Sequence, residues 1–267
     1  MTVLGVDGGL LEEPEHKPYV MLAPGERLDA WMDFSGRAVG SELAMRSIPF
    51  SGALPHMGMG MMGNNGYGLP MQSEYSIFTV RVSKKVGDSP KLPTKLSKLS
   101  AYKISDANNP NKPVPITISE GHMQMLLNGR PYAFKDIQDN ERIPVNTIQL
   151  MEISHEQGMG RMGMGGMQHG GMGGEMGMGG MMAMAHPIHL HGQQFQIVSR
   201  SIESSREGDY GTVNQGFINN GLKDTVLVMP GETVRIIKPF QDYKGLFMFH
   251  CHNLEHEDMG MMREFLV

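Results

Sequence analysis

The sequence is short of several residue types, and each shortage excludes a class of protein. There is one cysteine, Cys251, among 267 residues, so no disulfide can form within the chain. Lys and Arg total 23 against 28 Asp and Glu, and a net charge of −5 argues against a nucleic-acid partner. No stretch approaches the roughly 20 consecutive apolar residues of a transmembrane helix. Residues 1–9 lack the charged and apolar regions of a secretion signal.

Methionine and glycine are abundant instead, at 27 and 35 residues. Many of them fall in two low-complexity segments, residues 56–71 and residues 158–184. Glycine raises the chain entropy and unbranched methionine specifies packing poorly, so neither segment can form a core of its own. We predict that both are mobile surface loops. Thioether sulfur prefers Cu(I), so the loops either recruit that ion or are tolerated surface insertions.

Short alternating apolar and polar runs fill most of the remaining chain. Runs of about five residues between Gly and Pro turns, such as 2–6, 19–22, 28–34 and 74–82, are typical of antiparallel strands. Residues 84–115 are rich in Lys, Ser, Pro and Asn, which is the composition of a linker. We therefore predict an all-β protein with a first region over 1–83, a linker over 84–115, and a Greek-key β-sandwich over 116–267.

Two short strings near the C-terminus concentrate the residue types that bind metals. One reads His-Pro-Ile-His-Leu-His-Gly from His186, and the other reads His-Cys-His-Asn-Leu-Glu-His-Glu-Asp-Met-Gly-Met from His250. Successive side chains of a strand point to opposite faces, so Cys251 faces away from the imidazoles on either side of it. One strand can thus contact two different metal sites.

The ligand types in the strings divide into two sets. A thiolate, two imidazoles and a distant thioether are the ligands of a blue-copper electron-transfer site. The residues that supply them are Cys251, His186, His256 and Met261. The imidazoles directed at the second site are those of His189, His191, His250 and His252. Imidazole ligation without thiolate suits copper that binds dioxygen, although zinc accepts the same ligands.

Other interpretations of these residues are weaker. A structural zinc site usually has two or more cysteines at short spacing, whereas only Cys251 is present. A nucleophilic Cys–His pair would leave most histidines of the two strings without a role. Three histidines outside the strings are assigned to ordinary surface or core positions: His16, His122 and His155.

Both strings resemble the C-terminal copper-binding motifs of the multicopper oxidases, the family of laccases and cuprous oxidases. The bacterial periplasmic cuprous oxidases are most similar, since they share Met-rich insertions and the His-Glu-Asp-x-Gly-Met-Met ending. Residues 7–12, 22–27 and 33–34 resemble the latter half of the second cupredoxin domain of that family, and residues 128–132 resemble an early part of the third. The resemblance implies a complete cupredoxin-like C-terminal domain preceded by a partial one.

The resemblance also implies roles for individual residues. His186, Cys251 and His256 would hold a type 1 copper with Met261 axial, His189 would bind the type 2 copper, and His191, His250 and His252 would bind the type 3 pair. Glu257 matches an acidic residue that delivers protons to the oxygen-reducing cluster. Asp224 either orients a ligand histidine or belongs to a turn. Met184 matches a methionine that helps to bind substrate Cu(I), and Met182 replaces the acidic partner of that methionine.

The function implied is one-electron oxidation of Cu(I) or a phenolic donor, coupled to four-electron reduction of dioxygen to water. The trinuclear cluster of the family takes eight imidazoles, and four of them come from His-x-His pairs of a first domain that this sequence does not contain. We expect a complete type 1 site, a half-ligated cluster, and an N-terminal complementary chain or segment that supplies the other ligands. The resemblance places the protein in the periplasm or outside the cell.

Two other functions would use some of the same residues. A copper-binding electron-transfer or copper-handling module would use the type 1 site and the methionines without oxygen chemistry, and this alternative remains open. A two-domain nitrite reductase fits poorly, because that class does not need a histidine on both sides of Cys251.

Overall fold

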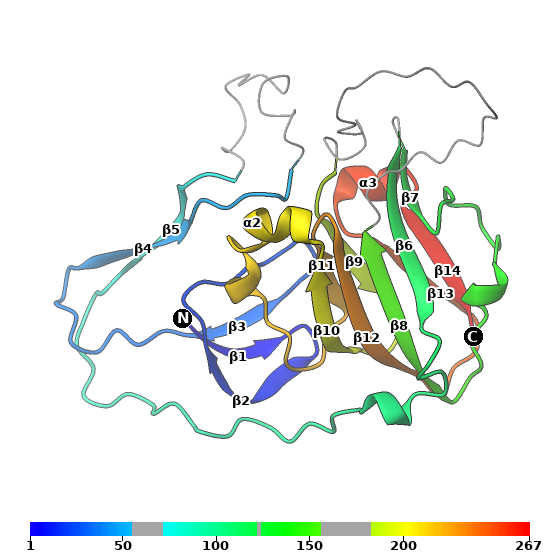
Figure 1. Cartoon of the computed structure of the whole chain (residues 1–267). Helices are drawn as coiled ribbons and strands as arrows, with labels where there is room; N and C mark the ends of the chain where they lie inside the picture. The colour runs from blue at the N-terminus through cyan, green and yellow to red at the C-terminus, as the bar shows by residue number, and fades with distance from the viewer. Residues whose placement is uncertain (55–71, 122–123, 156–182) are drawn as a thin grey trace, which may run out of the picture.

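The computed structural model describes residues 1–54, 72–121, 124–155 and 183–267 (Figure 1). The predicted loops over 56–71 and 158–184 lie outside these ranges, apart from residues 183–184 at the end of the second. His122 and Met182 lie outside them as well. The described residues form mainly strands, and these are arranged in four sheets.

Two sheets face each other in the C-terminal part of the chain. The five-stranded sheet has the order β10-β12-β8-β6-β7, and the four-stranded sheet has the order β11-β9-β13-β14. The first consists of β6 (Val114–Gly121), β7 (Gln124–Leu127), β8 (Thr147–His155), β10 (Gln196–Ile202) and β12 (Glu232–Phe240). The second consists of β9 (His186–Leu190), β11 (Thr225–Val228), β13 (Leu246–Cys251) and β14 (Met262–Leu266). All neighbouring strands are antiparallel except β6 and β8, which are parallel. The predicted all-β sandwich is confirmed.

An apolar core fills the space between these sheets. Alternate residues of β6 and β8, such as Ile116 and Ile153, are completely buried, as expected for strands with one inward face. Phe249 of β13 stacks on Phe265 of β14 with ring centroids 4.2 Å apart. Cys251 belongs to the same buried cluster. The candidate ligand thiol therefore lies at the edge of a packed apolar core.

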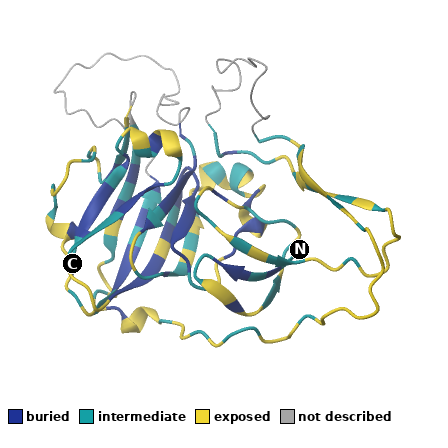
Figure 2. Ribbon diagram, turned by 180° about the vertical axis from the view of Figure 1, so that it is seen from behind, coloured by how far each residue is buried: buried dark blue, intermediate teal, exposed yellow. Residues whose placement is uncertain are grey.

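The N-terminal region forms two smaller sheets. One has the order β2-β1-β3, from β1 (Thr2–Val6), β2 (Gly9–His16) and β3 (Leu28–Trp31). The other is a hairpin of β4 (Glu42–Ser47) and β5 (Tyr75–Arg81). Figure 2 shows that burial is concentrated in the large sandwich, whereas the hairpin is largely exposed. The β1 sheet has a small core of Val3, Val6 and Leu11 that packs on Ile218 of the C-terminal part.

One predicted strand is wrong. Residues 19–22 form no strand, and the backbone N–H of Met21 donates instead to the carbonyl of Gly216 at the end of the 3-10 turn η5 (Asn214–Gly216). Residues 84–113 contain no strand, in keeping with a linker, and Figure 1 shows them passing beneath the β1 sheet toward β6. The domain limits at 83 and 116 remain a prediction.

Helical structure is limited to short turns in the described residues. They are η1 (Ile104–Asp106), η2 (Asp139–Glu141), η4 (Ser204–Arg206), α2 (Glu207–Tyr210), η5 (Asn214–Gly216) and α3 (Leu254–Asp258). In the part of the chain that the structure describes, none is long and apolar enough to cross a membrane.

The stacked aromatic pair gives a test of the core. Phe265 is 1% exposed, and replacing it with alanine removes a buried ring that the core cannot refill. We expect Phe265→Ala to lower the free energy of unfolding by about 3–5 kcal/mol. Phe78→Ala is the matched control, because Phe78 on the hairpin is 48% exposed and its loss is expected to cost about 0.5 kcal/mol or less. Urea unfolding measures both, and equal losses would contradict the assignment of the core.

Candidate metal centres

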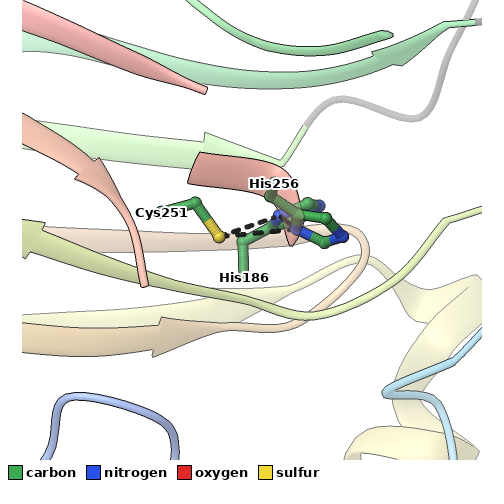
Figure 3. Close-up of side chains that lie close together, drawn as sticks. All are labelled: His186, Cys251 and His256. Atoms are coloured by element: carbon green, nitrogen blue, oxygen red, sulfur yellow. Dashed lines mark hydrogen bonds between the residues drawn. The ribbon is translucent and has the colours of Figure 1, made fainter. Parts of the chain in front are cut away.

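The end of β13, the start of β9 and the short helix α3 bring a thiol and two imidazoles together. Cys251 lies opposite Ile188 in the antiparallel pair. Its Sγ is 3.5 Å from Nδ1 of His186 and 3.5 Å from Nδ1 of His256 (Figure 3). The two Nδ1 atoms are 3.2 Å apart. All three side chains are buried, so three ligand atoms converge on one point inside the protein.

This spacing fits a metal ion. Bonds of about 2.0 Å to nitrogen and 2.3 Å to sulfur, arranged trigonally, separate the ligand atoms by about 3.5–3.8 Å. The Nε2 of His186 lies 2.7 Å from Oε1 of Glu120, so Nε2 donates its hydrogen to the carboxylate. The lone pair of Nδ1 is then directed toward Cys251. The hydrogen bond thus selects the tautomer that a metal requires.

The ionisation states of the three groups also suit a metal. Burial raises the pKa of the Cys251 thiol to about 12. Burial lowers the pKa of His186 to about 4, although the nearby Glu120 opposes that shift. Burial also lowers the pKa of His256. At neutral pH the metal-free site therefore holds one thiol and two neutral imidazoles, and only the thiol has a proton for a metal to displace.

The fourth predicted ligand of this site, Met261, is fully buried in the same apolar cluster as Cys251. Its carbonyl accepts a hydrogen bond of 3.0 Å from the backbone N–H of Cys251. The backbone N–H of Asn253 donates to the Cys251 sulfur over 3.4 Å. These contacts hold the turn after β13 around the sulfur atom. The axial role of Met261 remains a prediction.

The four other histidines of the two strings gather at a second centre. Nε2 of His191 and Nε2 of His250 are 3.2 Å apart. The ring centroid of His189 lies 4.9 Å from that of His191, 5.3 Å from that of His250 and 5.7 Å from that of His252. Nδ1 of His250 is 3.0 Å from the carbonyl of Cys251, to which it donates, so its Nε2 lone pair faces the group. Burial lowers the pKa of His191 and of His250, so both imidazoles are neutral at pH 7. We call these four histidines the imidazole site.

Two residues beside His186, Glu120 and His155, belong to no motif that the sequence reveals. Oε1 of Glu120 accepts hydrogen bonds from His186 and from the backbone N–H of Met184, and it lies 3.5 Å from Nε2 of His155. Burial raises the pKa of Glu120, but the hydrogen bonds from His155 and His186 outweigh it and lower the pKa to about 2. Glu120 is therefore a carboxylate. It lies 66 residues before His186, so only the pairing of strands brings the two together.

The remaining predicted residues lie around the imidazole site or near Glu120. Oε2 of Glu257 is 3.7 Å from Nδ1 of His250, and the Glu257 side chain is 32% exposed. Oδ1 of Asp224 is 3.5 Å from Nδ1 of His189. Met184 contacts Glu120 through its backbone, while Met182 lies outside the described residues. The structure thus places Glu257 and Asp224 beside predicted ligands.

Comparisons with known proteins agree with this geometry. Residues 174–267 match the family model of the multicopper oxidases. A laccase of Haloferax volcanii is 45% identical over 82 residues, which are 31% of this chain and 13% of that laccase. A bilirubin oxidase of Albifimbria verrucaria is 26% identical over 98% of this chain and 38% of its own length. The chain spans less than half of the length of these relatives.

Solved structures give the same result over nearly the whole chain. The McoA multicopper oxidase of Aquifex aeolicus has a TM-score of 0.70 and 26% identity, and the match covers 98% of this chain and 48% of McoA. A multi-copper oxidase of Pediococcus acidilactici has a TM-score of 0.67 and 27% identity over 99% of this chain and 43% of that enzyme. The fold and the buried Cys–His–His set define a cupredoxin-like copper protein.

The sequence and structural matches agree on one family. Residues 174–267 match the multicopper oxidase model, and the chain as a whole is similar in sequence and fold to multicopper oxidases. The predicted family, fold class and copper cofactor are confirmed, whereas the roles of individual ligands remain predictions. Copper held by Cys251, His186 and His256 would supply one-electron chemistry at this site.

The raised pKa of Cys251 gives a test at the first site. Because the thiol is protonated at pH 7 in the metal-free protein, copper binding must displace that proton. We expect the wild-type chain to release about one proton more per chain than Cys251→Ser when both are loaded with Cu(II). A pH-stat titration measures this difference, and any release from the imidazole site cancels. No difference between the two proteins would show that Cys251 is not a ligand in the protein.

The hydrogen bond to His186 gives a second test. Glu120→Ala frees the His186 ring to rotate, so we expect Cu(II) affinity at the Cys251 site to fall about 10–100-fold. Glu120→Gln retains an oxygen acceptor and should restore most of the affinity. Competition titrations followed by the visible absorption of the site measure both variants. Glu152→Ala is the control, because Glu152 pairs with exposed Arg235. Equal affinity in all variants would exclude an orienting role for Glu120.

Proposed function

We propose that this chain provides the electron-accepting site and half of the oxygen-reducing site of a multicopper oxidase. The enzyme would oxidise Cu(I) or phenolic donors one electron at a time and reduce dioxygen to water with four electrons. The observation that carries the proposal is the position of Cys251, whose sulfur joins one buried ligand set while its chain neighbours His250 and His252 join the other.

Sequence adjacency gives the electron a short route between the two sites. An electron accepted at Cys251 has to cross the backbone only as far as the neighbouring residue to reach His250 or His252. The rigid pairing of β13 with β9 keeps this path short, because His250 lies opposite His189 and Cys251 lies opposite Ile188. Buried surroundings around Cys251 exclude water from the first site, and this suits electron transfer without side reactions.

Protons for water formation would arrive through Glu257. Its carboxylate is partly exposed and lies 3.7 Å from Nδ1 of His250, so it links solvent with the edge of the imidazole site. A carboxylate in this position can accept a proton from water and pass it inward. We propose this role for Glu257 and the direct electron-accepting role for Cys251.

The donor would meet the protein near His186. Met184 lies two residues before this imidazole, and its backbone is held by Glu120. We propose that Met184 and Met182, together with the Met-rich segment over 158–184, present thioether sulfur to Cu(I). A phenolic donor would also deliver its electron near His186. The periplasm or the extracellular space is the proposed location.

The imidazole site needs a partner to become a full cluster. By the resemblance to the family, four more imidazoles complete it, and we propose that an N-terminal complementary chain or segment supplies them. The proposed organisation is a partial second cupredoxin domain over 1–83, a linker over 84–115 and the third domain over 116–267. The second candidate function, an electron-transfer module without oxidase activity, uses the Cys251 site alone.

The experiment that tests the function compares the chain alone with the same chain joined to the N-terminal half of a multicopper oxidase relative. After copper loading, the chain alone should show one intensely coloured copper at Cys251, further copper at the imidazole site, and negligible oxygen uptake. The joined protein should consume oxygen with Cu(I) or a phenol, and Cys251→Ser should abolish that uptake. Deleting residues 159–182 should depress Cu(I) oxidation more than phenol oxidation. Filled copper sites without oxygen uptake in the joined protein would favour the electron-transfer module.

A further inference from the structure

A tight turn of the N-terminal region lies against the imidazole site. It comprises residues 23–27, and we call it the 23–27 loop. The turn is closed by its own hydrogen bonds, because the carboxylate of Glu26 accepts from the backbone N–H of Ala23 and the carbonyl of Ala23 accepts from the backbone N–H of Glu26. Gly25 at its tip has a φ of +84°, a conformation that side chains other than glycine rarely adopt. Contacts within the loop therefore contribute to its shape.

The tip of the loop touches one of the four imidazoles directly. A Cβ atom built on Gly25 would be 2.5 Å from Cδ2 and 2.8 Å from Cγ of His252. Both distances are well inside van der Waals contact, so the His252 ring packs on the bare backbone of Gly25. No other residue type leaves room for the ring in this position. The backbone of Gly25 therefore limits how the His252 ring can turn.

The end of the loop reaches a second imidazole through a carboxylate. Both terminal nitrogens of Arg27 donate to Asp224, Nη1 to Oδ1 and Nη2 to Oδ2, each over 2.6 Å. The fork geometry holds the carboxylate in one orientation. Oδ1 of Asp224 is 3.5 Å from Nδ1 of His189, and the hydroxyl of Thr225 contacts both, 3.1 Å from Oδ1 and 3.0 Å from Nδ1. Arg27 thus influences the orientation of His189 indirectly, through Asp224.

Buried ion pairs fasten the same loop to the residues just before β11. Lys223, which is 2% exposed, lies 3.1 Å from Glu26 and 3.3 Å from Asp7. Asp7 also accepts the backbone N–H of Arg27 over 2.9 Å and the backbone N–H groups of Asp224 and Thr225 over 3.2 Å each. Ion pairs this well buried lose several kcal/mol when one partner is removed. The loop and the start of β11 therefore form one rigid unit.

We propose that the 23–27 loop is a positioning element for the imidazole site, in which Gly25 fixes the ring of His252 and Arg27, acting through Asp224, fixes the ring of His189. Arg27 and Asp224 are 197 residues apart in the sequence. The proposal rests on the proposed function, because it takes these imidazoles to be copper ligands. Rings held in their binding orientation lose less entropy when a metal binds, so the loop strengthens metal binding without contributing a ligand.

The loop acts on one site only, and this makes the inference testable within a single molecule. Cu(II) is added to the full chain, the copper of the Cys251 site is counted from its intense visible absorption, and the copper of the imidazole site is the total copper bound per chain less that amount. Gly25→Ala and Arg27→Gln should each weaken copper binding at the imidazole site about 10–100-fold. Both variants should leave the visible absorption of the Cys251 site per chain unchanged. Arg27→Lys should be intermediate, because an ammonium group cannot bind both oxygens in a fork.

Two control variants separate positioning from general strain. Gly36 has a φ of +79°, but a Cβ atom built there meets nothing within 4 Å, so Gly36→Ala repeats the backbone change of Gly25→Ala without the contact to His252. Arg235 pairs with Glu152 over 2.8 Å and is 49% exposed, so Arg235→Gln repeats the loss of an arginine ion pair elsewhere. Both controls should retain both kinds of copper at wild-type affinity.

Each outcome decides a different point. If the wild-type chain binds no copper beyond that of the Cys251 site, the imidazole site of the proposed function is wrong, and the inference fails with it. If the wild-type chain binds copper at the imidazole site, and the Gly25 and Arg27 variants bind that copper equally well, the inference alone is overturned. If these variants lose both kinds of copper in parallel, the loop supports the fold in general and the inference is also overturned.

Discussion

Alternation of side chains along β13 determines the arrangement of both candidate metal centres. Adjacent residues of a strand face opposite ways, so the Cys251 sulfur enters the apolar core while His250 points toward the imidazole site. Antiparallel pairing with β9 sets the register that places His186 beside the sulfur and His189 beside His250. A shift of one residue in this pairing would exchange the two faces and dismantle both sites. The packed core around Phe249 and Phe265 holds that register.

The buried ligand side chains at the Cys251 site are uncharged before a metal binds, and the carboxylates near both sites are paired with other groups. Burial raises the pKa of Cys251 and lowers that of His186, so the metal-free Cys251 site is neutral and compatible with its apolar surroundings. The charged carboxylates near the two sites each have hydrogen-bond partners. Glu120 receives hydrogen bonds at the Cys251 site, and Asp224 is held by Arg27 at the imidazole site. Both carboxylates orient imidazoles, which links the N-terminal region and β6 to ligands on β9.

Much of the fold and the ligand strings could be predicted from the sequence, because strand periodicity and ligand spacing are local properties. The two ligand sets around Cys251 follow from alternation alone, and the all-β sandwich follows from short runs between turns. Alternation over residues 19–22 predicts a strand that does not form, since alternation does not reveal whether a pairing partner exists. The sequence gives no sign of Glu120 or of the place of His155, because strand pairing brings both to His186 from distant positions. The contact of Gly25 with His252 is equally non-local.

In the proposed function, the single strand β13 serves two copper sites on its opposite faces. Diffraction from crystals of the copper-loaded chain, recorded on both sides of the copper absorption edge, locates copper atoms directly. We predict one anomalous peak bonded to Cys251, His186 and His256, and separate anomalous density among the imidazoles on the other side of β13. Copper confined to methionines, with the Cys251 sulfur free of metal, would show that β13 does not serve two copper sites.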